Sequence, residues 1–533
     1  MKGECTVDFG RKSGKFSFSD NTLWTMRTNV VKNPRNPAVM YEETVISWAE
    51  LWERSNRLGN ALKKLGLKKG ERVQVFLPNC LEYPEVVIGI NKAGLVVTTG
   101  NFRLTGQELS YQLNDSGSRA IIMKSVEQYE NLKKIREEVA NLEYVIIIDD
   151  NDIEGCYSYY ELLNDASPAD PDVDVHPEDI QLLMYTGGTT GRPKAAARTF
   201  KSNYHMANAV CHELGLTPKD IYLAVAPLYA AASMGYMYAT LLSGGTVGIV
   251  PAFIPDRILS YVEKYRATWM FMVPIMYEWI LNLPSDVLTK PDISSLKHVC
   301  SCGAPLKNQT ALKIIEFFKD AEVTNWLGAS ELGFISKYSY KNGLKDEGCV
   351  GKAVFDLELA IFDEKGEPVK AGETGILYAR GYSVWEGYLN KPEATQEAFF
   401  DHEWGTVGDI VYQDEDGDFY IVDRKNDMII TGGINVYPAE VEKVILTMPE
   451  VRDVAVIGVP DEKWGEAVKA IVVRKPGSDV SEEDIIKYCR TKLAGFKVPK
   501  SVDFIEEIPR SLVGKTLRRE LRKKYWEGHN LKI

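Results

Sequence analysis

A tract rich in glycine, threonine and basic residues has the clearest chemistry in this sequence. It reads Tyr185-Thr-Gly-Gly-Thr-Thr-Gly-Arg-Pro-Lys194 and follows the apolar run Ile180–Met184. Glycines allow successive backbone N–H groups to converge on an anion, threonine hydroxyls add donors, and arginine and lysine add positive charge. The composition therefore fits a polyphosphate, and a flexible glycine-threonine surface loop is the alternative. The tract is not a P-loop, because Gly191-Arg-Pro-Lys194 lacks the Gly-Lys-Ser/Thr ending that opens a helix.

Two carboxylates further along the chain are candidates for the rest of a nucleotide site. Glu331 ends the segment Asn325-Trp-Leu-Gly-Ala-Ser-Glu331, and a carboxylate beside a triphosphate is a ligand that Mg²⁺ requires. A capped helix start is the alternative for this Ser-Glu pair. Asp409 ends Trp404-Gly-Thr-Val-Gly-Asp409 and can accept both hydroxyls of a ribose, unless it is only a turn aspartate.

Two basic groups complete the set of candidates. Asp423-Arg424 is either part of the nucleotide site or a surface ion pair of small energetic value. Lys515 lies on the glycine-bearing segment Pro509–Lys515, just before a basic stretch that a solvated tail would also explain.

Alternating strands and helices must position these residues. Val73–Leu77, Ala120–Met123 and Tyr144–Ile148 are short β-branched runs, and they alternate with the helical stretches Trp48–Leu65 and Val126–Val139. This alternation predicts an α/β fold, in which mostly parallel sheets are flanked by helices.

A smaller version of the pattern begins after Asp423. We expect a helix to start within Val436–Glu442 and strands over Asp453–Gly458 and Ala470–Val473. The prediction is a large N-terminal domain over residues 1–425 and a small α+β C-terminal domain over 426–533, which carries Lys515.

Composition narrows the class of protein. The 533 residues are 45% hydrophobic and 26% charged, with a net charge of −12, as in a soluble protein that does not bind nucleic acid. Cys300-Ser-Cys302 is the only close cysteine pair, so we expect reduced thiols, no cysteine-ligated metal and a cytoplasmic location.

The amino terminus lacks the apolar segment of a secretory leader. The uncharged stretch Ile221–Pro255 is broken by prolines and glycines, so we expect buried helix and strand and no membrane span.

In their order and spacing, these segments resemble the AMP-forming adenylating superfamily of acyl-CoA synthetases, peptide-synthetase adenylation domains and firefly-type luciferases. The resemblance covers residues 21–524. It implies that a carboxylate attacks Mg²⁺-bound ATP to give acyl-AMP and pyrophosphate. A thiol, here coenzyme A, then gives a thioester and AMP.

The resemblance also implies a role for each matching residue. Lys515 bridges the carboxylate and the α-phosphate, and Glu331 is the second catalytic residue. The magnesium contacts are Glu331 and Thr189. The residues that the resemblance assigns to ATP and AMP are Thr186, Gly187, Gly188, Thr189, Thr190, Gly191, Lys194, Gly303, Ala304, Pro305, Ser330, Asp409 and Arg424. Those that it assigns to the acyl pocket are Tyr229, Ala230, Met234, Trp326 and Gly328. Gly432 and Gly433 form the coenzyme A tunnel, and Asn426 is the hinge of the C-terminal domain.

The sequence departs from the family pattern at three of these places. Leu327 replaces an aromatic residue that commonly stacks on adenine, so Trp326 is a substitute candidate. Ala230 replaces a histidine that gates the acyl site; a roomier pocket and simple helix packing both explain it. Asn426 stands where aspartate or lysine is usual.

The acceptor and the acyl group are less determined. No carrier domain follows in the sequence, so free coenzyme A is favoured over a carrier protein. Basic residues near the carboxyl terminus are candidates for its 3′-phosphate, and a solvated basic face is the alternative. They are Lys492, Lys497, Lys500, Arg518, Arg519, Arg522, Lys523 and Lys524. The apolar acyl residues favour a monocarboxylate: medium-chain, branched, alicyclic or aromatic. A non-catalytic binder of nucleotide and acyl ligand is a further alternative, and a homodimer is possible.

Overall fold

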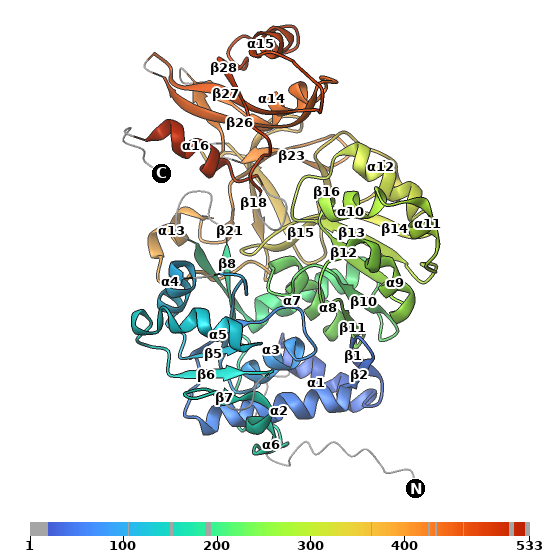
Figure 1. Cartoon of the computed structure of the whole chain (residues 1–533), viewed down its shortest axis with the longest axis vertical. Coiled ribbons are helices and arrows are strands. Elements are labelled where there is room, and N and C mark those ends of the chain that lie inside the picture. The colour runs from blue at the N-terminus through green and yellow to red at the C-terminus, as the bar shows by residue number, and fades with distance from the viewer. Residues whose placement is uncertain are drawn as a thin grey trace.

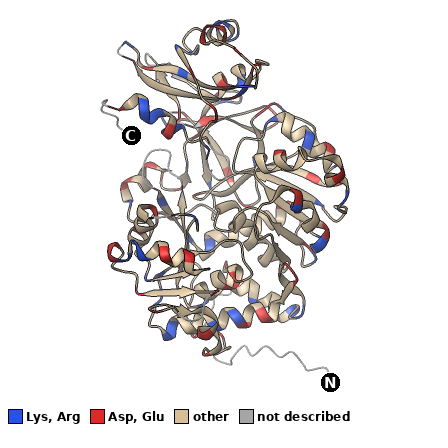
Figure 2. Ribbon diagram, in the orientation of Figure 1, with Lys and Arg blue, Asp and Glu red and all other residues tan. Residues whose placement is uncertain are grey.

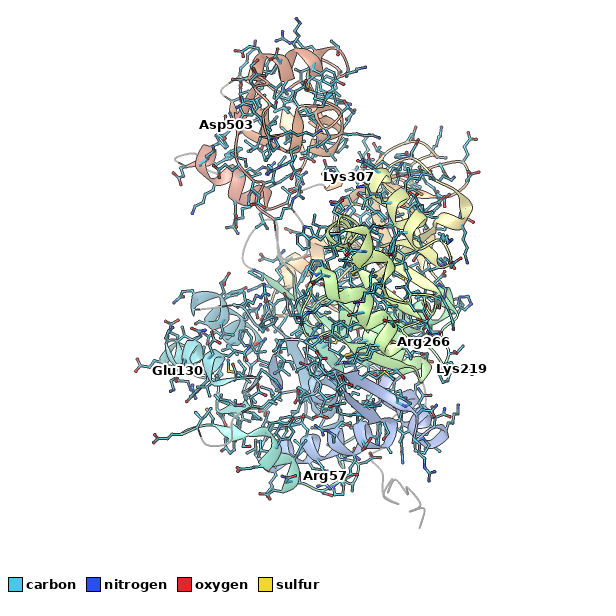
Figure 3. The ribbon with its side chains drawn as sticks, turned by 45° about the vertical axis from the view of Figure 1, so that its right-hand side comes forward. Arg57, Glu130, Lys219, Arg266, Lys307 and Asp503 are labelled. Atoms are coloured by element: carbon cyan, nitrogen blue, oxygen red, sulfur yellow. The ribbon has the colours of Figure 1, made fainter. Side chains whose placement is uncertain are left out.

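The computed structural model describes residues 20–104, 106–149, 153–186, 193–363, 365–424, 427–431, 434–461, 463–510 and 516–527. Figure 1 shows a large domain and a smaller C-terminal domain (orange to red) at one end of the long axis. Figure 3 labels Asp503 in the smaller domain, and Lys307 at the edge of the large domain that is nearest to it. The predicted mixed α/β fold with a large N-terminal and a small C-terminal domain is confirmed.

An eight-stranded sheet in the large domain has the order β19-β9-β8-β4-β3-β5-β6-β7. Its parallel strands are β3 (Arg72–Phe76), β4 (Val96–Thr99), β5 (Ala120–Met123), β6 (Tyr144–Ile147), β7 (Tyr157–Ser158) and β8 (Ile180–Thr186). Two antiparallel strands, β9 (Lys194–Thr199) and β19 (Gly387–Tyr388), close one edge. The helices of this part are α1 (Thr22–Lys32), α2 (Trp48–Lys64), α3 (Tyr83–Lys92), α4 (Gly106–Ser116), α5 (Val126–Lys133) and α6 (Tyr159–Asn164).

A fifteen-stranded sheet forms the rest of the large domain. Its parallel strands are β1 (Pro37–Tyr41), β10 (Ile221–Ala224), β11 (Thr246–Ile249), β12 (Trp269–Met272), β13 (His298–Cys302) and β14 (Glu322–Ala329). Antiparallel strands extend it: β2 (Thr44–Ser47), β15 (Gly333–Ser339), β16 (Cys349–Ala353), β17 (Glu358–Phe362), β18 (Gly375–Arg380), β20 (Phe399–Phe400), β21 (Trp404–Gly405), β22 (Asp409–Gln413) and β23 (Phe419–Arg424). Its helices are α7 (Phe200–Leu214), α8 (Ala231–Ser243), α9 (Pro255–Tyr265), α10 (Pro274–Leu281), α11 (Ser285–Thr289), α12 (Asn308–Phe317) and α13 (Pro392–Glu397).

The small domain has a sheet of five strands and its own apolar core. The strands are β24 (Ile429–Thr431), β25 (Ile434–Val436), β26 (Val451–Asp461), β27 (Gly465–Arg474) and β28 (Ser501–Phe504), and the helices are α14 (Pro438–Ile445), α15 (Glu482–Arg490) and α16 (Arg518–Trp526). The expected helix near 436–442 and both expected strands are confirmed. Because the small domain has a buried core of its own, it is a separate structural domain.

One predicted helix is wrong in its second half. The stretch 126–139 begins as helix α5, but the α-helix ends at Lys133 and a single 3₁₀ turn follows over Arg136–Glu138. Leu132, Ile135 and Val139 nevertheless reach one apolar cluster. The 3₁₀ turn therefore brings these three residues to the same cluster, as a continued α-helix would. The sequence periodicity does not distinguish the two conformations.

The uncharged stretch at 221–255 contains β10, α8 and β11, and most of its apolar side chains are buried. No helix in the described part of the chain has the length and apolarity to cross a membrane. Basic and acidic side chains are interspersed over the visible ribbon (Figure 2). The prediction of buried helix and strand is therefore confirmed.

Candidate active site

The predicted phosphate-binding tract connects two antiparallel strands at the edge of the eight-stranded sheet. Thr186 ends β8, and Lys194 begins β9 directly opposite it in the strand register. Tyr185, the first residue of the tract, donates its hydroxyl to Asp115 Oδ2 at 2.9 Å. The ends of the tract are thereby held by backbone pairing and by a partly buried side chain.

Glu331 lies on the turn between β14 and β15, and not at a helix start. The side chain is 6% exposed, and its Oε1 accepts a hydrogen bond of 2.9 Å from the Tyr388 hydroxyl. Its backbone carbonyl accepts the Trp385 N–H at 2.9 Å. The hairpin is tight because Gly333 has φ +74°, and because a Cβ on Gly328 would lie 2.7 Å from the Gly333 carbonyl oxygen.

One tyrosine brings the phosphate tract and Glu331 together. Tyr388 is on β19, opposite Ala196 of β9. Its hydroxyl contacts Glu331, and the Lys194 ammonium lies 5.0 Å from the centre of its ring. A cation and a carboxylate thus lie beside one aromatic side chain, and these are the two kinds of group that bind a phosphate and Mg²⁺, respectively.

The two candidates for ribose binding are cross-strand partners. Asp409 begins β22, is 4% exposed, and lies opposite Arg424 of β23. The turn before it is fixed, because the Gly408 N–H donates to Thr406 Oγ1 at 3.0 Å and the Thr406 hydroxyl donates to the Leu377 carbonyl at 2.6 Å. The side chain of Arg424 lies outside what the structure describes.

Gly303, Ala304 and Pro305 follow the carboxyl end of β13, next to β14 in the parallel part of the sheet. Gly303 has φ +87°, a conformation that favours glycine. Because β14 leads into Ser330 and Glu331, the segment and the glutamate lie at the same edge. Ligands of parallel α/β sheets bind at this edge.

The predicted acyl residues gather around the start of α8 and the end of β14. Ala230 is the N-cap of α8, and Met234 is buried one turn later. Trp326 is buried and contacts Phe334 edge-on at 5.5 Å between ring centres, and its Nε1 donates to Thr324 Oγ1 at 2.9 Å. Trp326 therefore belongs to the core on the α8 side of the strand.

Tyr229 is half-buried in front of α8 and meets Phe102 at 6.0 Å between ring centres. Sequence reasoning missed the basic residue beside it. Burial raises the pKa of Tyr229, and the charge of nearby Arg103 opposes that rise. Arg103 is exposed on the loop after β4 and had no motif to mark it.

Several predicted residues lie outside the described part of the chain. They are Gly187, Gly188, Thr189, Thr190, Gly191, Asn426, Gly432, Gly433 and Lys515, and the side chain of Thr186 is not described either.

Arg518, one of the candidates for a coenzyme A phosphate, is ion-paired inside the small domain. Its guanidinium donates to Asp427 at 3.1 Å and to Glu442 at 2.7 and 2.9 Å. Burial opposes its charge, but Glu442 and Asp427 hold its pKa above the ordinary value. The residue ties α16 to the start of the small domain and to helix α14.

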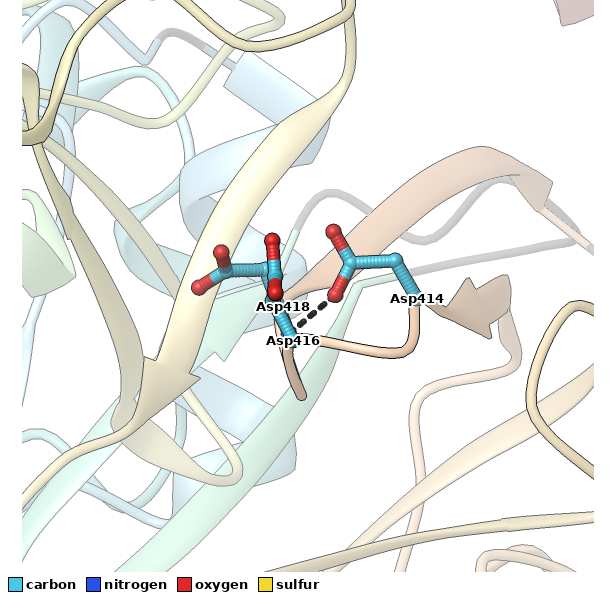
Figure 4. A group of neighbouring side chains, drawn as sticks. All are labelled: Asp414, Asp416 and Asp418. Atoms are coloured by element: carbon cyan, nitrogen blue, oxygen red, sulfur yellow. Dashed lines mark hydrogen bonds between the residues drawn. The ribbon is translucent and has the colours of Figure 1, made fainter.

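Three aspartates on the turn between β22 and β23 resemble a metal site (Figure 4). They are Asp414, Asp416 and Asp418. The Lys345 ammonium, however, lies 3.1, 2.8 and 3.0 Å from their carboxylates, respectively. The lysine already forms an ion pair with each of the three carboxylates, so we assign no metal there.

Comparisons with known proteins identify the family. The AMP-binding enzyme model matches residues 26–389, and the model of the AMP-binding enzyme C-terminal domain matches residues 440–515. A feruloyl-CoA synthase of Amycolatopsis is 36% identical over 497 residues, covering 92% of this chain and 96% of the relative. A long-chain-fatty-acid–CoA ligase of Mycobacterium tuberculosis is 33% identical and covers 95% of this chain and 98% of its own.

Solved structures of other proteins are also similar to this chain over nearly its whole length. ATP-bound MatB from Rhodopseudomonas palustris is 29% identical, with a TM-score of 0.87 over 96% of this chain and 100% of that chain. An anthranilate CoA ligase in complex with anthranoyl-AMP is 28% identical, with a TM-score of 0.84 over 96% of this chain and 98% of that chain. This protein belongs to the AMP-binding enzyme family.

Proposed function

We propose that this protein is an AMP-forming acid–thiol ligase. A carboxylate attacks the α-phosphate of ATP, forming acyl-AMP and releasing pyrophosphate; the thiol of coenzyme A then attacks the acyl carbonyl and releases AMP. The observation that carries the proposal is the contact of Lys194 and Glu331 with the same Tyr388 side chain, beside the phosphate tract. The names of the relatives, feruloyl-CoA synthase and long-chain-fatty-acid–CoA ligase, support it.

The nucleotide is held by residues from three segments. Lys194 and the tract before it bind the β- and γ-phosphates, since an ammonium and convergent N–H groups suit a polyphosphate. Asp409 accepts the two ribose hydroxyls, and Arg424 is its partner across the strands. Gly303, with its positive φ, lets the backbone approach the adenine and the acyl group closely.

Glu331 fits the magnesium role. A buried carboxylate needs a compensating charge, and the Tyr388 hydroxyl occupies only Oε1, so Oε2 can face a cation. Glu331 and the hydroxyl of Thr189 would hold Mg²⁺, which when bound supplies positive charge beside the phosphates. The substrate carboxylate and the triphosphate repel each other, so this charge and that of Lys194 and Lys515 are needed to bring them together.

We assign the boundary between the domains to 425 and 426, and the hinge to Asn426. The large domain contacts the small one close to this point, because Asp423 Oδ2 accepts the Ala439 N–H at 2.9 Å. In the first half-reaction Lys515 contacts the reacting groups; the small domain then rotates, and Gly432 and Gly433 line the path of the thiol.

The acyl substrate in this proposal is an apolar monocarboxylate: medium-chain, branched, alicyclic or aromatic. Ala230, Ala231 and Ala232 begin helix α8 yet stay partly exposed, so they do not merely fill the core. Small side chains at this position favour a roomy pocket beside Tyr229.

The test is pyrophosphate release with Mg·ATP across a panel of monocarboxylates, with and without coenzyme A. Multiple turnovers that require coenzyme A support the ligase and name its acyl class. Turnover that coenzyme A leaves unchanged would instead favour a carrier-protein acceptor. No release with any acid, despite nucleotide binding, would indicate a non-catalytic binder.

A cytoplasmic location and a homodimer are part of the same proposal. The described cysteines are free thiols, as expected in a reducing compartment. Light scattering coupled to size-exclusion chromatography tests the dimer directly, since a mass near the 59.9 kDa of one chain would reject it.

A further inference from the structure

A fully buried arginine lies on the strand that leaves the phosphate tract. Arg198, on β9, is 1% exposed. Its Nη1 donates to the backbone carbonyls of Ser330 and Glu331, both at 3.2 Å, and its Nη2 donates to the Ser383 carbonyl at 2.7 Å. One guanidinium thus joins β9, the turn that carries Glu331, and the segment that leads to β19.

A chain of buried amides fixes the orientation of this guanidinium. Arg198 Nε donates to Asn203 Oδ1 at 2.8 Å, and the Asn203 amide donates to Gln181 Oε1 at 2.9 Å. The Gln181 amide in turn donates to Asn91 Oδ1 at 3.0 Å and to Thr22 Oγ1 at 2.9 Å. Because Gln181 is on β8, both strands that frame the tract contribute to the same network.

Such a group is expensive to bury. Its bonds within the described part of the chain go to neutral carbonyl and amide oxygens, and no carboxylate oxygen pairs with it directly. Burial lowers the pKa of Arg198 to about 10, although the negative charges of Glu331 and Glu386 oppose this, so the guanidinium stays charged at neutral pH. Buried charges without a direct partner are costly, and a role in a site explains why one is kept.

The other end of Glu331 is held from β19, the strand that pairs with β9. Tyr388 lies opposite Ala196 of β9, and its hydroxyl donates to the Glu331 carboxylate at 2.9 Å. Arg198 therefore holds the main chain of Glu331 and Tyr388 holds its carboxylate. The two contacts leave the side chain little freedom to change its rotamer.

We propose that Arg198 and Tyr388 are positioning residues that lock the magnesium-binding carboxylate of Glu331 to β9, and so to the phosphate tract. This inference rests on the proposed function of Glu331. Neither residue contacts substrate in this account. Each acts through Glu331, as residues behind a metal ligand commonly do, and losing such a residue typically weakens metal binding or activity by roughly 10- to 100-fold.

Tyr388→Phe is the sharpest test, because it removes one hydroxyl and keeps the ring that Lys194 contacts. We expect the Mg²⁺ concentration for half-maximal pyrophosphate release to rise about tenfold, while the KM for the carboxylate is unchanged. A readout without turnover is Mn²⁺ binding, followed by electron paramagnetic resonance in the presence of α,β-methylene-ATP. It should weaken by the same factor.

Arg198→Lys keeps the charge but loses the planar fork that reaches the Ser330, Glu331 and Ser383 carbonyls at once. It should weaken Mn²⁺ binding at least as much as Tyr388→Phe does. Lys92→Met is the matched control, because Lys92 is also a fully buried basic side chain that donates to a backbone carbonyl, that of Trp52 at 3.1 Å. It should lower the Tm and leave Mn²⁺ binding as in the wild type.

Three results would count against the inference. Unchanged Mn²⁺ binding in Tyr388→Phe and Arg198→Lys, with an active wild type, overturns the positioning roles and leaves the ligase intact. Equal weakening in Lys92→Met overturns them too, because the effect would then be general destabilisation. A wild type that binds no Mn²⁺ with the nucleotide analogue, and releases no pyrophosphate, overturns the proposed function together with this inference.

Discussion

Replacing Asp409 by alanine is the most direct test of the nucleotide site. The carboxylate is 4% exposed at the start of β22, opposite Arg424. In the proposed function it accepts the two ribose hydroxyls. A hydrogen bond to a charged group contributes about 1.5–3 kcal/mol. Loss of one such contribution raises the Kd for ATP by roughly 10- to 150-fold.

The assay compares ATP with 2′,3′-dideoxy-ATP, which lacks both hydroxyls. Wild-type enzyme should prefer ATP by the same factor of roughly 10- to 150-fold, and Asp409→Ala should show almost no preference. The comparison separates recognition of the ribose from general damage, because damage would weaken both nucleotides equally.

Asp418→Ala is the matched control on the same β-hairpin. Asp418 is also buried, and it pairs with Lys345 at 3.0 Å, at the turn and away from Arg424. It should lower the Tm and keep the preference for ATP. The reasoning fails if Asp409→Ala retains the wild-type preference, since the ribose would then be held elsewhere.

Three further predictions concern the reaction, the acyl pocket and stability. Lys515→Ala should nearly abolish pyrophosphate release but spare thioester formation from added acyl-AMP; equal loss of both steps would contradict the domain rotation. Ala230→Phe should lower kcat/KM more for the bulkiest accepted acid than for the smallest, and a uniform loss would place the pocket elsewhere. Burial lowers the pKa of His298 below its ordinary 6.5, while Glu322 opposes this. The stability that its neutral form contributes is therefore complete above pH 6.5, and it is lost as the pH falls from 6.5 through the lowered pKa of the folded state. His298→Gln should therefore reduce the fall in Tm between about pH 7 and pH 5, and an unchanged Tm–pH curve would refute this.

The parallel parts of the fold are readable from sequence because they are buried on both faces. The expected strands at Val73–Leu77, Ala120–Met123 and Tyr144–Ile148 match β3, β5 and β6 to within a residue at each end. Strands in this environment appear as continuous β-branched runs. The antiparallel half of the second sheet has no such signal, because strands as far apart in sequence as β16 and β23 pair there.

The candidate site likewise contains some residues that the sequence predicts and others that it does not. Lys194, Glu331 and Asp409 have motif neighbours, and these local patterns indicate their chemistry from residue types alone. Tyr388 and Arg198 lack such neighbours. They come together with Glu331 through the pairing of β9 with β19, two strands that lie far apart in the sequence. Local patterns predict which groups are charged, whereas tertiary pairing decides which of them share a ligand.

The ion pairs of Arg518 bear on how the proposed rotation would work. Asp427 directly follows the proposed hinge at Asn426, and its carboxylate accepts a hydrogen bond of 3.1 Å from Arg518. Arg518 begins α16, shortly after Lys515 in the chain, and also holds Glu442. Asp427, directly after the proposed hinge, and helix α16, shortly after Lys515 in the chain, are therefore parts of one ion-paired unit. Because such a unit rotates as a body, a change of dihedral angles at the hinge moves the start of α16, and with it the chain that carries Lys515, without any rearrangement inside the small domain.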